Sequence, residues 1–313
     1  MPNTILVCGS LAFDTIAVFD GHFKDHLLAD NIQSLSVSFF VPSMRKEYGG
    51  CAGNIAYNLR QLGANPIPVG TVGGDAADYL EYMKKQGIDT RLVRVLPDMF
   101  TPQCFITTDL DNNQIASFHP GAMQHSADND LSGTPAAWGI VAPDAKEGMF
   151  AHAERLREEN IPFVFDLGQA MPLFDKDDLE RMFELTQILS ANDYEATVIE
   201  QRTGRKIADI ARSLQAAVIT RGAEGATLYE NGTETSIEGI PVDKVVDPTG
   251  CGDAHRAGLL YGLQAGWSLI DACRLANVLG AIKIGSRGPQ NHALDQATIR
   301  QLMQKHYQVD VAL

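Results

Sequence analysis

Residues 161–204, IPFVFDLGQAMPLFDKDDLERMFELTQILSANDYEATVIEQRTG, alternate between two hydrophobic patterns. The runs IPFVFDLG and QILSAN are short and apolar, which is typical of buried strands. The segments near 176–187 and at 193–204 have the apolar spacing of helices instead. Because each strand is followed by a helix, the stretch predicts parallel strands covered by helices on both faces of one sheet.

The same alternation extends from this stretch toward both ends of the chain. Further strands are expected at 4–10, 66–73, 138–143 and 216–222, and further helices at 52–63, 75–87, 144–160, 250–266, 268–284 and 295–307. Residues 226–242 predict an antiparallel pair that turns at Asn231-Gly232. No repeat, low-complexity tract or linker interrupts the pattern, so residues 1–313 are predicted to form a single α/β domain.

Two stretches, 15–48 and 101–119, alternate like strands but are not followed by a helix. The run DLDNN in the second stretch is a good hairpin turn. The two stretches therefore predict a small antiparallel sheet that forms a lid over the carboxyl ends of the parallel strands, where open α/β sheets bind ligands. Ordinary surface hairpins would give the same pattern.

Charge and cysteine content limit the class of partner. The chain has 25 Lys and Arg against 39 Asp and Glu, a net charge of -14, which disfavours a nucleic-acid partner. Its 5 cysteines are scattered without metal-site spacing, as expected for a reducing compartment. The N-terminus has no signal-peptide pattern and no segment is long and apolar enough for a membrane span, so a cytoplasmic protein with small-molecule partners is expected.

Residues 245–263, VVDPTGCGDAHRAGLLYGL, place a carboxylate in the first turn of a predicted helix, directly after two glycines. The backbone N–H groups of Gly250, Cys251 and Gly252 could form a nest for an anion, with Asp253 beside it. Phosphoryl transfer needs this combination, because a base must accept a proton where phosphate charge develops. Simple helix-start chemistry, with Thr249 as the cap, fits these residues equally well.

Several short motifs resemble those of the ribokinase (PfkB) family of carbohydrate and nucleoside kinases. DPTGCGDAHRAG at 247–258 resembles the C-terminal signature of the family, and GGCAGN at 49–54 resembles its N-terminal glycine motif. NDYE at 192–195 and TRGAEG at 220–225 resemble its N-x-x-E and nucleotide-site motifs. The motifs occur in family order, and the usual P-loop and dinucleotide fingerprints are missing. The resemblance implies a three-layer αβα sandwich with a mostly parallel central sheet and a β lid.

The resemblance also implies roles for individual residues. Asp253 would be the base that activates an acceptor hydroxyl, and Gly250, Cys251 and Gly252 would supply the anion hole. Sugar hydroxyls would be held by Asp14, Gly49, Gly50 and Asn54, and the nucleotide by Asn192, Thr220, Gly222 and Gly225. Glu195 would act on Mg²⁺ through water. Taken alone, Asp14 would be a loop acid, Asn54 a helix-start residue, NDYE a capping box and TRGAEG a strand-ending turn.

Departures from the family pattern occur at the C-terminal signature. Cys251 replaces an alanine, and His255 stands where an aromatic residue is common. Arg256 follows, either to reach a phosphate or as an exposed helix arginine. The resemblance further places a monovalent-cation site of the K⁺ type, built mainly of backbone carbonyls, near the segments containing Asp247 and Ser286. Whether this chain requires such an ion stays open at this point, as does a homodimer through the lid.

The acceptor is expected to be a nucleoside, adenosine or another purine nucleoside, phosphorylated by ATP at its 5′-hydroxyl. FHPGAM at 118–123 and RGPQNH at 287–292 resemble segments of adenosine-kinase-like members. Phe118 is the expected platform for the base, with Phe13, Phe39, Phe105 and His119 as further candidates. Core packing would explain the same aromatics. The alternatives are a ribokinase- or fructokinase-like sugar kinase, or a catalytically weak nucleoside-binding sensor.

Overall fold

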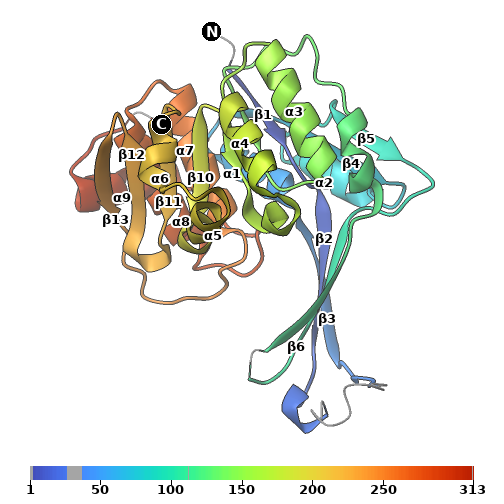
Figure 1. The fold of residues 1–313 in the computed structure, drawn as a ribbon. Helices are drawn as coiled ribbons and strands as arrows, with labels where there is room; N and C mark the ends of the chain where they lie inside the picture. Colours follow the sequence, from blue (N-terminus) through green and yellow to red (C-terminus); the bar gives the residue numbers. More distant parts are fainter. Residues whose placement is uncertain (1–2, 27–36, 112, 312) are drawn as a thin grey trace.

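The computed structural model describes residues 3–26, 37–111, 113–311 and 313, whose strands form two sheets (Figure 1). The larger sheet has nine strands, in the order β13 (Thr233–Glu238), β12 (Gly225–Glu230), β11 (Ala216–Thr220), β10 (Ile188–Asn192), β9 (Phe163–Asp166), β8 (Trp138–Val141), β1 (Thr4–Cys8), β4 (Asn65–Gly73) and β5 (Val93–Leu96). All neighbouring pairs are parallel except those that β12 makes with β11 and β13.

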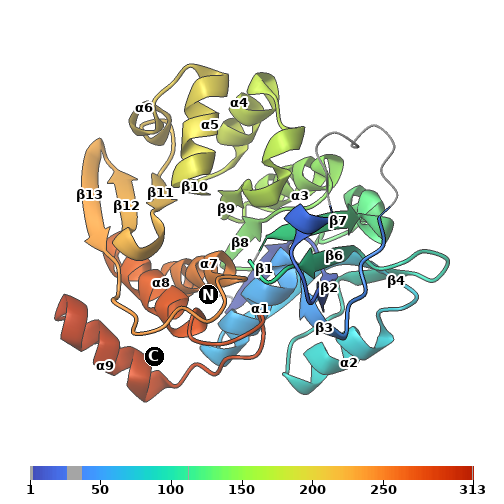
Figure 2. The ribbon, with the colours of Figure 1, turned by 90° about the horizontal axis from the view of Figure 1, so that it is seen from below.

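Helices cover both faces of this sheet, as Figure 2 shows from below. One face carries α1 (Cys51–Gln61), α2 (Ala77–Lys85), α7 (Cys251–Gln264) and α8 (Leu269–Lys283), with α9 (Gln296–Tyr307) packed on α8. The other carries α3 (Lys146–Glu158), α4 (Lys176–Leu185), α5 (Asp193–Thr203) and α6 (Ile207–Ala211). Side chains alternate along a strand, so Ile5 and Val7 of β1 pack into the core on the α1 face of the sheet, whereas Leu6 and Cys8 pack into the core on the α3 face. The predicted three-layer αβα sandwich is confirmed.

The smaller sheet is the lid, which extends away from the main body (Figure 1). Its strands lie in the order β3 (Ser43–Gly49), β2 (Ala12–Val18), β6 (Gln103–Thr108) and β7 (Gln114–His119). The hairpins β2–β3 and β6–β7 are antiparallel, as predicted, while β2 and β6 join them by a parallel pairing. Residues 27–36 of the predicted lid stretch lie outside the described residues.

Some elements differ from the sequence prediction. The strand β5, the helix α6 and the 3-10 segments at 121–128 and 168–173 were not expected. The helix α4 ends at Leu185, two residues before the predicted end, because Thr186 is extended and its hydroxyl donates to Phe163 O at 2.9 Å. Short elements of this kind have too few residues for a hydrophobic period to be recognised.

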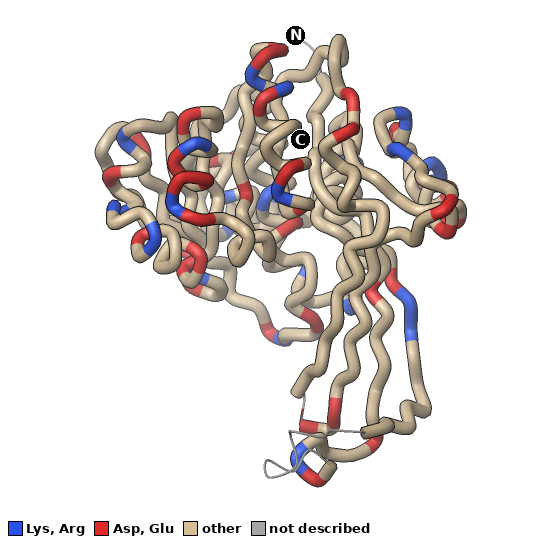
Figure 3. Tube along the Cα trace, turned by 45° about the vertical axis from the view of Figure 1, so that its right-hand side comes forward, with Lys and Arg blue, Asp and Glu red and all other residues tan. Residues whose placement is uncertain are grey.

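Charged residues are mixed along the described trace (Figure 3). Lys and Arg alternate with Asp and Glu over the helices of the main body, and ion pairs such as Lys146–Asp178 and Arg205–Glu180 connect them. None of the described helices combines the length and the apolar character that a membrane crossing requires.

Candidate active site

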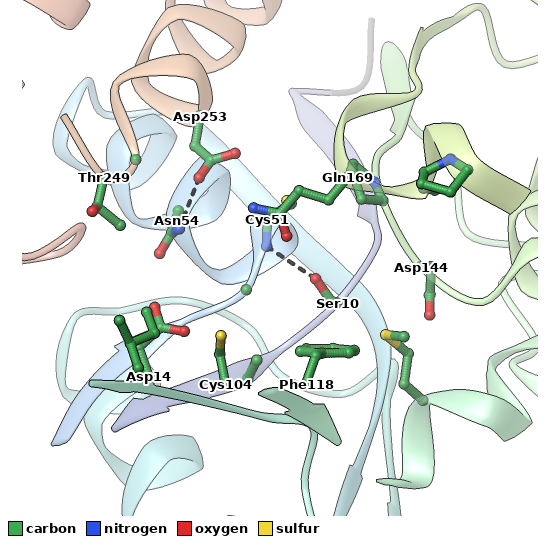
Figure 4. Close-up of a pocket in the computed structure, with 18 of the residues that line it drawn as sticks. Ser10, Asp14, Cys51, Asn54, Cys104, Phe118, Asp144, Gln169, Thr249 and Asp253 are labelled. Carbon is green, nitrogen blue, oxygen red and sulfur yellow. Dashed lines mark hydrogen bonds between the residues drawn. The ribbon is translucent and has the colours of Figure 1, made fainter. Parts of the chain in front are cut away.

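A pocket of about 710 Å³ lies at the carboxyl ends of β1 and β8, under the lid (Figure 4). In the sheet, β1 lies between β8 and β4. The chain adds β4 and β5 on one side of β1 and later returns to add β8 on its other side, so the direction in which strands are added reverses at β1. Such switch points are where open α/β sheets bind ligands. Ser10 follows β1, Asp144 follows β8, and Asp253 comes from α7, so three elements distant in sequence meet in the pocket.

Asp253 lies in the first turn of α7 and lines the pocket. Its Oδ2 accepts a hydrogen bond from Asn54 Nδ2 at 2.8 Å, which fixes the orientation of the carboxylate. Burial raises the pKa of the Asp253 carboxyl, while Arg256 and the Asn54 hydrogen bond oppose that rise. A carboxylate with a raised pKa is better suited to accept a proton near neutral pH than an exposed one.

The turn before α7 has the backbone of an anion nest. Gly250 is the N-cap with a φ of 81°, and a Cβ there would lie 2.8 Å from Pro289 Cβ. The amides of Gly250 and Gly252 donate to no acceptor in the described residues, whereas the Cys251 amide donates to Pro248 O at 3.1 Å. Thr249 does not cap the helix, since no side-chain cap is present and its amide donates to Asp247 Oδ1 at 2.9 Å.

Arg256 and His255 are both buried in the next turn of α7. The Arg256 guanidinium is paired with Asp166, with Nη2 at 2.6 Å from Oδ1 and Nε also in contact with the carboxylate. Arg256 is therefore not an exposed helix arginine, because its side chain is buried and its charge is paired with Asp166. Burial also lowers the pKa of His255 to about 3, which keeps the imidazole neutral.

Asp14 faces the pocket from the lid, in a row of paired residues across the four strands. It is opposite Glu47 on β3 and Cys104 on β6, and Cys104 is opposite Phe118 on β7. Burial raises the pKa of Asp14 to about 6, and the nearby carboxylates, first that of Asp253, add to the rise. Gly49 leaves room for this carboxylate, because a Cβ there would lie 2.6 Å from Asp14 Oδ2.

The sequence motifs did not reveal a buried hydrogen-bond chain behind Asn54. Gln290 Nε2 donates to Asn54 Oδ1 at 2.9 Å and approaches Tyr79 Oη at 2.8 Å. The Tyr79 hydroxyl in turn donates to Gly49 O at 2.7 Å. Gly50, the N-cap of α1, has a φ of 83°, and a Cβ there would lie 2.5 Å from Ser10 O. These hydrogen bonds hold the Gly49-Gly50 turn and the amide of Asn54 in a fixed position relative to Asp253.

The predicted nucleotide residues lie at the ends of β10 and β11, outside the pocket. Asn192 and Thr220 are register partners on these two strands. Asn192 and Glu195 form a capping box at the start of α5, so the structural explanation of NDYE is present. Gly222, with a φ of 55°, has open space where a Cβ would stand. At Gly225 a Cβ would lie 2.2 Å from Ile237 O, so this glycine is required by close strand packing.

The other end of the pocket is mostly apolar. Phe118, Met123 and Leu173 line it, together with the polar side chains of Asp144 and Gln169. Asp144 is 4% exposed, and its Oδ2 has no hydrogen-bond partner in the described residues. Burial raises the pKa of Asp144 to about 7. No motif marked Asp144 or Gln169, and only their positions after β8 and β9 could have suggested them.

Of the aromatic candidates named from the sequence, only Phe118 lines the pocket. Phe13 is buried against Tyr48 and Tyr79, and Phe39 packs against Phe19 and Phe23. Phe105 and His119 are on the opposite face of the lid from Cys104 and Phe118, because neighbouring residues of a strand point to opposite faces. Core packing and surface exposure explain these four aromatics.

The arrangement joins a carboxylate, a helix N-terminus with free amides and a lid-covered pocket at a switch point. These are the parts that transfer of a phosphoryl group to a hydroxyl requires. The fold and the site are thus those of a phosphotransferase that acts on a hydroxyl group. Residues 5–297 match the pfkB family carbohydrate kinase model, and the chain belongs to this family.

Individual relatives agree with this assignment. A nucleoside kinase of Methanothermobacter thermautotrophicus is 30% identical over 305 residues, which cover 93% of this chain and 92% of the relative. A solved structure of Burkholderia thailandensis nucleoside kinase in complex with inosine has a TM-score of 0.89 and 43% identity, covering 98% of this chain and 100% of that one. Its complex with ADP-inosine has a TM-score of 0.86 and 45% identity, covering 98% and 97%. The chain is therefore a kinase of the nucleoside and sugar class.

Proposed function

We propose that the chain transfers the γ-phosphoryl group of ATP to the 5′-hydroxyl of a purine nucleoside, adenosine or a close analogue. The observation that carries this proposal is the division of the pocket into two ends (Figure 4). Asp14, Asn54 and Asp253 gather at one end, whereas Phe118 and Asp144 lie at the other, and Asp144 Oδ2 has no hydrogen-bond partner in the described residues. A ribose with hydroxyls on one side and a flat base on the other matches this division.

Asp253 accepts the proton of the attacking hydroxyl in this proposal. Its Oδ2 is held by Asn54, which leaves Oδ1 to face the acceptor. The free amides of Gly250 and Gly252, at the positive end of α7, hold the charge of the transferring phosphate. The Cys251 amide joins them once its bond to Pro248 O is released. Asp14 accepts hydrogen bonds from ribose hydroxyls at the lid.

The donor nucleotide lies over β10 and β11, along Thr220 and Gly222, with Asn192 at the adjacent strand end. The site fits Mg²⁺ held by phosphates and water, with Glu195 in the outer shell. Both Glu195 oxygens already accept from Asn192, at 2.8 and 2.9 Å, yet each keeps a lone pair for a water molecule. Bound Mg²⁺ would neutralise phosphate charge during transfer.

The base is the part of the substrate that the apolar end recognises. Phe118 is half exposed in the pocket and offers a ring face, and stacking of a base on an aromatic ring contributes about 1–3 kcal/mol. Asp144 offers a carboxyl that either accepts or donates a hydrogen bond near pH 7. The relatives named nucleoside kinase, one of them solved with inosine, support the same acceptor class.

A panel of acceptors tests this proposal. ADP release would be measured with Mg-ATP and adenosine, inosine, guanosine, cytidine, ribose or fructose as the acceptor. Purine nucleosides are expected to give the highest kcat/KM. Turnover with free sugars alone would replace the nucleoside by a sugar acceptor, and nucleoside binding without turnover would favour the sensor.

The lid also carries the proposed homodimer contact. Its outer face, opposite the pocket, exposes Met44, Phe105 and Ile115 by 70%, 45% and 42%. Apolar side chains that gather on one sheet face mark an interaction surface, and we take a second copy of the chain as its occupant. Sedimentation velocity should give a dimer for the unmodified chain and a monomer for Phe105→Glu. A monomeric unmodified chain would refute this contact.

All five cysteines are free thiols, and burial raises the pKa of Cys251 to about 11. A thiol with such a pKa is mostly protonated and slow to oxidise at neutral pH. The cytoplasmic location expected from the cysteine pattern stays a prediction, which localisation of a fluorescent fusion would test.

A further inference from the structure

Lys283, the last residue of α8, is the one lysine with a fully buried side chain in the described part of the chain. Its Nζ donates to Asp247 O at 2.7 Å and to Ser286 O at 3.2 Å. Burial of an ammonium away from water is unfavourable unless polar partners compensate it. A lysine in this position therefore requires an explanation beyond packing.

The two carbonyls belong to the loops on either side of the α7–α8 pair. Asp247 precedes α7 and Ser286 follows α8, and the Asp247 carboxylate also accepts from Gly288 N and Thr249 N, each at 2.9 Å. The ammonium and this carboxylate together tie the two loops to each other. Inorganic monovalent cations use backbone carbonyls in the same way, as oxygen ligands at loop turns.

The tied loops hold the catalytic end of the pocket. Pro289 packs against Gly250 in the anion nest, and Gln290 reaches the amide of Asn54 that orients Asp253. The positive charge of Lys283 also acts on the first turn of α7. Burial raises the pKa values of Cys251 and Asp253, and Lys283 opposes both rises. Lys283 is thus near enough to stabilise negative charge in the first turn of α7.

We infer that the Lys283 ammonium takes the place of a monovalent cation, so that this kinase supplies its own cation and does not need K⁺. The carbonyls of Asp247 and Ser286 already accept from Nζ, and they do not fit an added K⁺ while the lysine is present. Lys283 is a positioning residue for the anion nest. The inference rests on the anion-binding role proposed for α7.

The unmodified enzyme provides the first test. Initial rates would be measured with Mg-ATP and the best acceptor of the panel, in KCl, NaCl, NH₄Cl or choline chloride at equal ionic strength. The rates should agree within about twofold, because screening is matched and no ion site is open. Activation of tenfold or more by K⁺ over choline would overturn the inference.

The neutral variant Lys283→Met provides the second test. Its kcat in choline chloride should fall by about tenfold or more, and KCl or NH₄Cl should restore part of it, because the vacated carbonyls can bind a small cation. Lys305→Met, on the exposed side of α9, is the matched control and should show neither effect. Full activity of Lys283→Met in choline would refute the inference, as would a loss that no cation reverses in a folded variant.

Thermal unfolding separates this inference from the proposed acceptor. The melting temperature of Lys283→Met should rise with KCl relative to choline chloride, because an ion that binds only the folded state stabilises it. This readout needs no substrate, so it holds even if the nucleoside assignment fails. If Lys283→Met does not fold in any salt, the salt panel of the unmodified enzyme decides alone.

Discussion

Asn54 Nδ2 donates to Asp253 Oδ2 at 2.8 Å and thereby joins the N-terminal glycine motif to the C-terminal one. The amide itself is held by Gln290, so Asn54 Oδ1 is not free to rotate toward the carboxylate. One oxygen of Asp253 is committed to this bond, and the other is left for the acceptor hydroxyl. The proposed base and the residue that orients it therefore come from segments 199 residues apart.

The substitution Asp253→Asn should remove the proposed base but keep the size of the side chain and its hydrogen bond with Asn54. We expect kcat to fall by about 10²–10⁴, because general-base catalysis contributes that much. Binding of ADP, measured by calorimetry, should change little, since the residues proposed to hold the nucleotide lie at the ends of β10 and β11. Asp98→Asn, an exposed acid away from the pocket, serves as the control. Turnover of Asp253→Asn near that of the control would show that another group takes the proton.

Gln290→Met should act on catalysis through Asn54 rather than through substrate contact. The buried amide of Asn54 would lose a partner, which costs about 1–3 kcal/mol where a polar group stays unpaired. We expect kcat to fall by about tenfold or more, with a smaller change in the acceptor KM. Gln301→Met on the exposed face of α9 is the matched control. An increase in KM at unchanged kcat would instead assign Gln290 to substrate binding.

Asp14 should give acceptor binding a pH dependence. Its pKa is raised to about 6, so the carboxylate takes up a proton as the pH falls through 6. Ribose hydroxyls bind the charged form better, so the contribution of Asp14 to affinity should be constant above this value and decrease below it, by up to roughly tenfold per pH unit. Calorimetry of nucleoside binding between pH 5 and 8 measures this decrease. Asp14→Asn should bind weakly and lack this component, and identical pH profiles for the two proteins would contradict the assignment.

The sequence motifs predicted the fold and pointed to the α7 turn that lines the pocket, because the information there is local. The glycines at 50 and 250 have positive φ values that a short motif specifies, and Asp253 follows within three residues. Asp144, Gln290 and Lys283 could not be predicted in the same way. Their roles depend on burial and on partners from distant loops, and a lone acid, amide or lysine has no pattern that signals such contacts. The parallel pairing of β2 with β6 could not be predicted either, because it joins strands that are far apart in the sequence.

Asp144→Leu should change base recognition and spare the chemistry. The side chain fills similar space next to Met123 and Phe118 but cannot form a hydrogen bond to the base edge. A lost hydrogen bond that leaves the base edge unpaired costs about 1–3 kcal/mol, so the nucleoside KM should rise roughly tenfold to a hundredfold with a small change in kcat. Residual turnover of free ribose, which has no base, should be unaffected and provides the internal control. Asp144→Asn keeps one donor and one acceptor, and we expect it to alter the preference between adenosine and inosine rather than weaken both. Equal loss with ribose and nucleosides would mean that Asp144 supports the pocket and does not read the base.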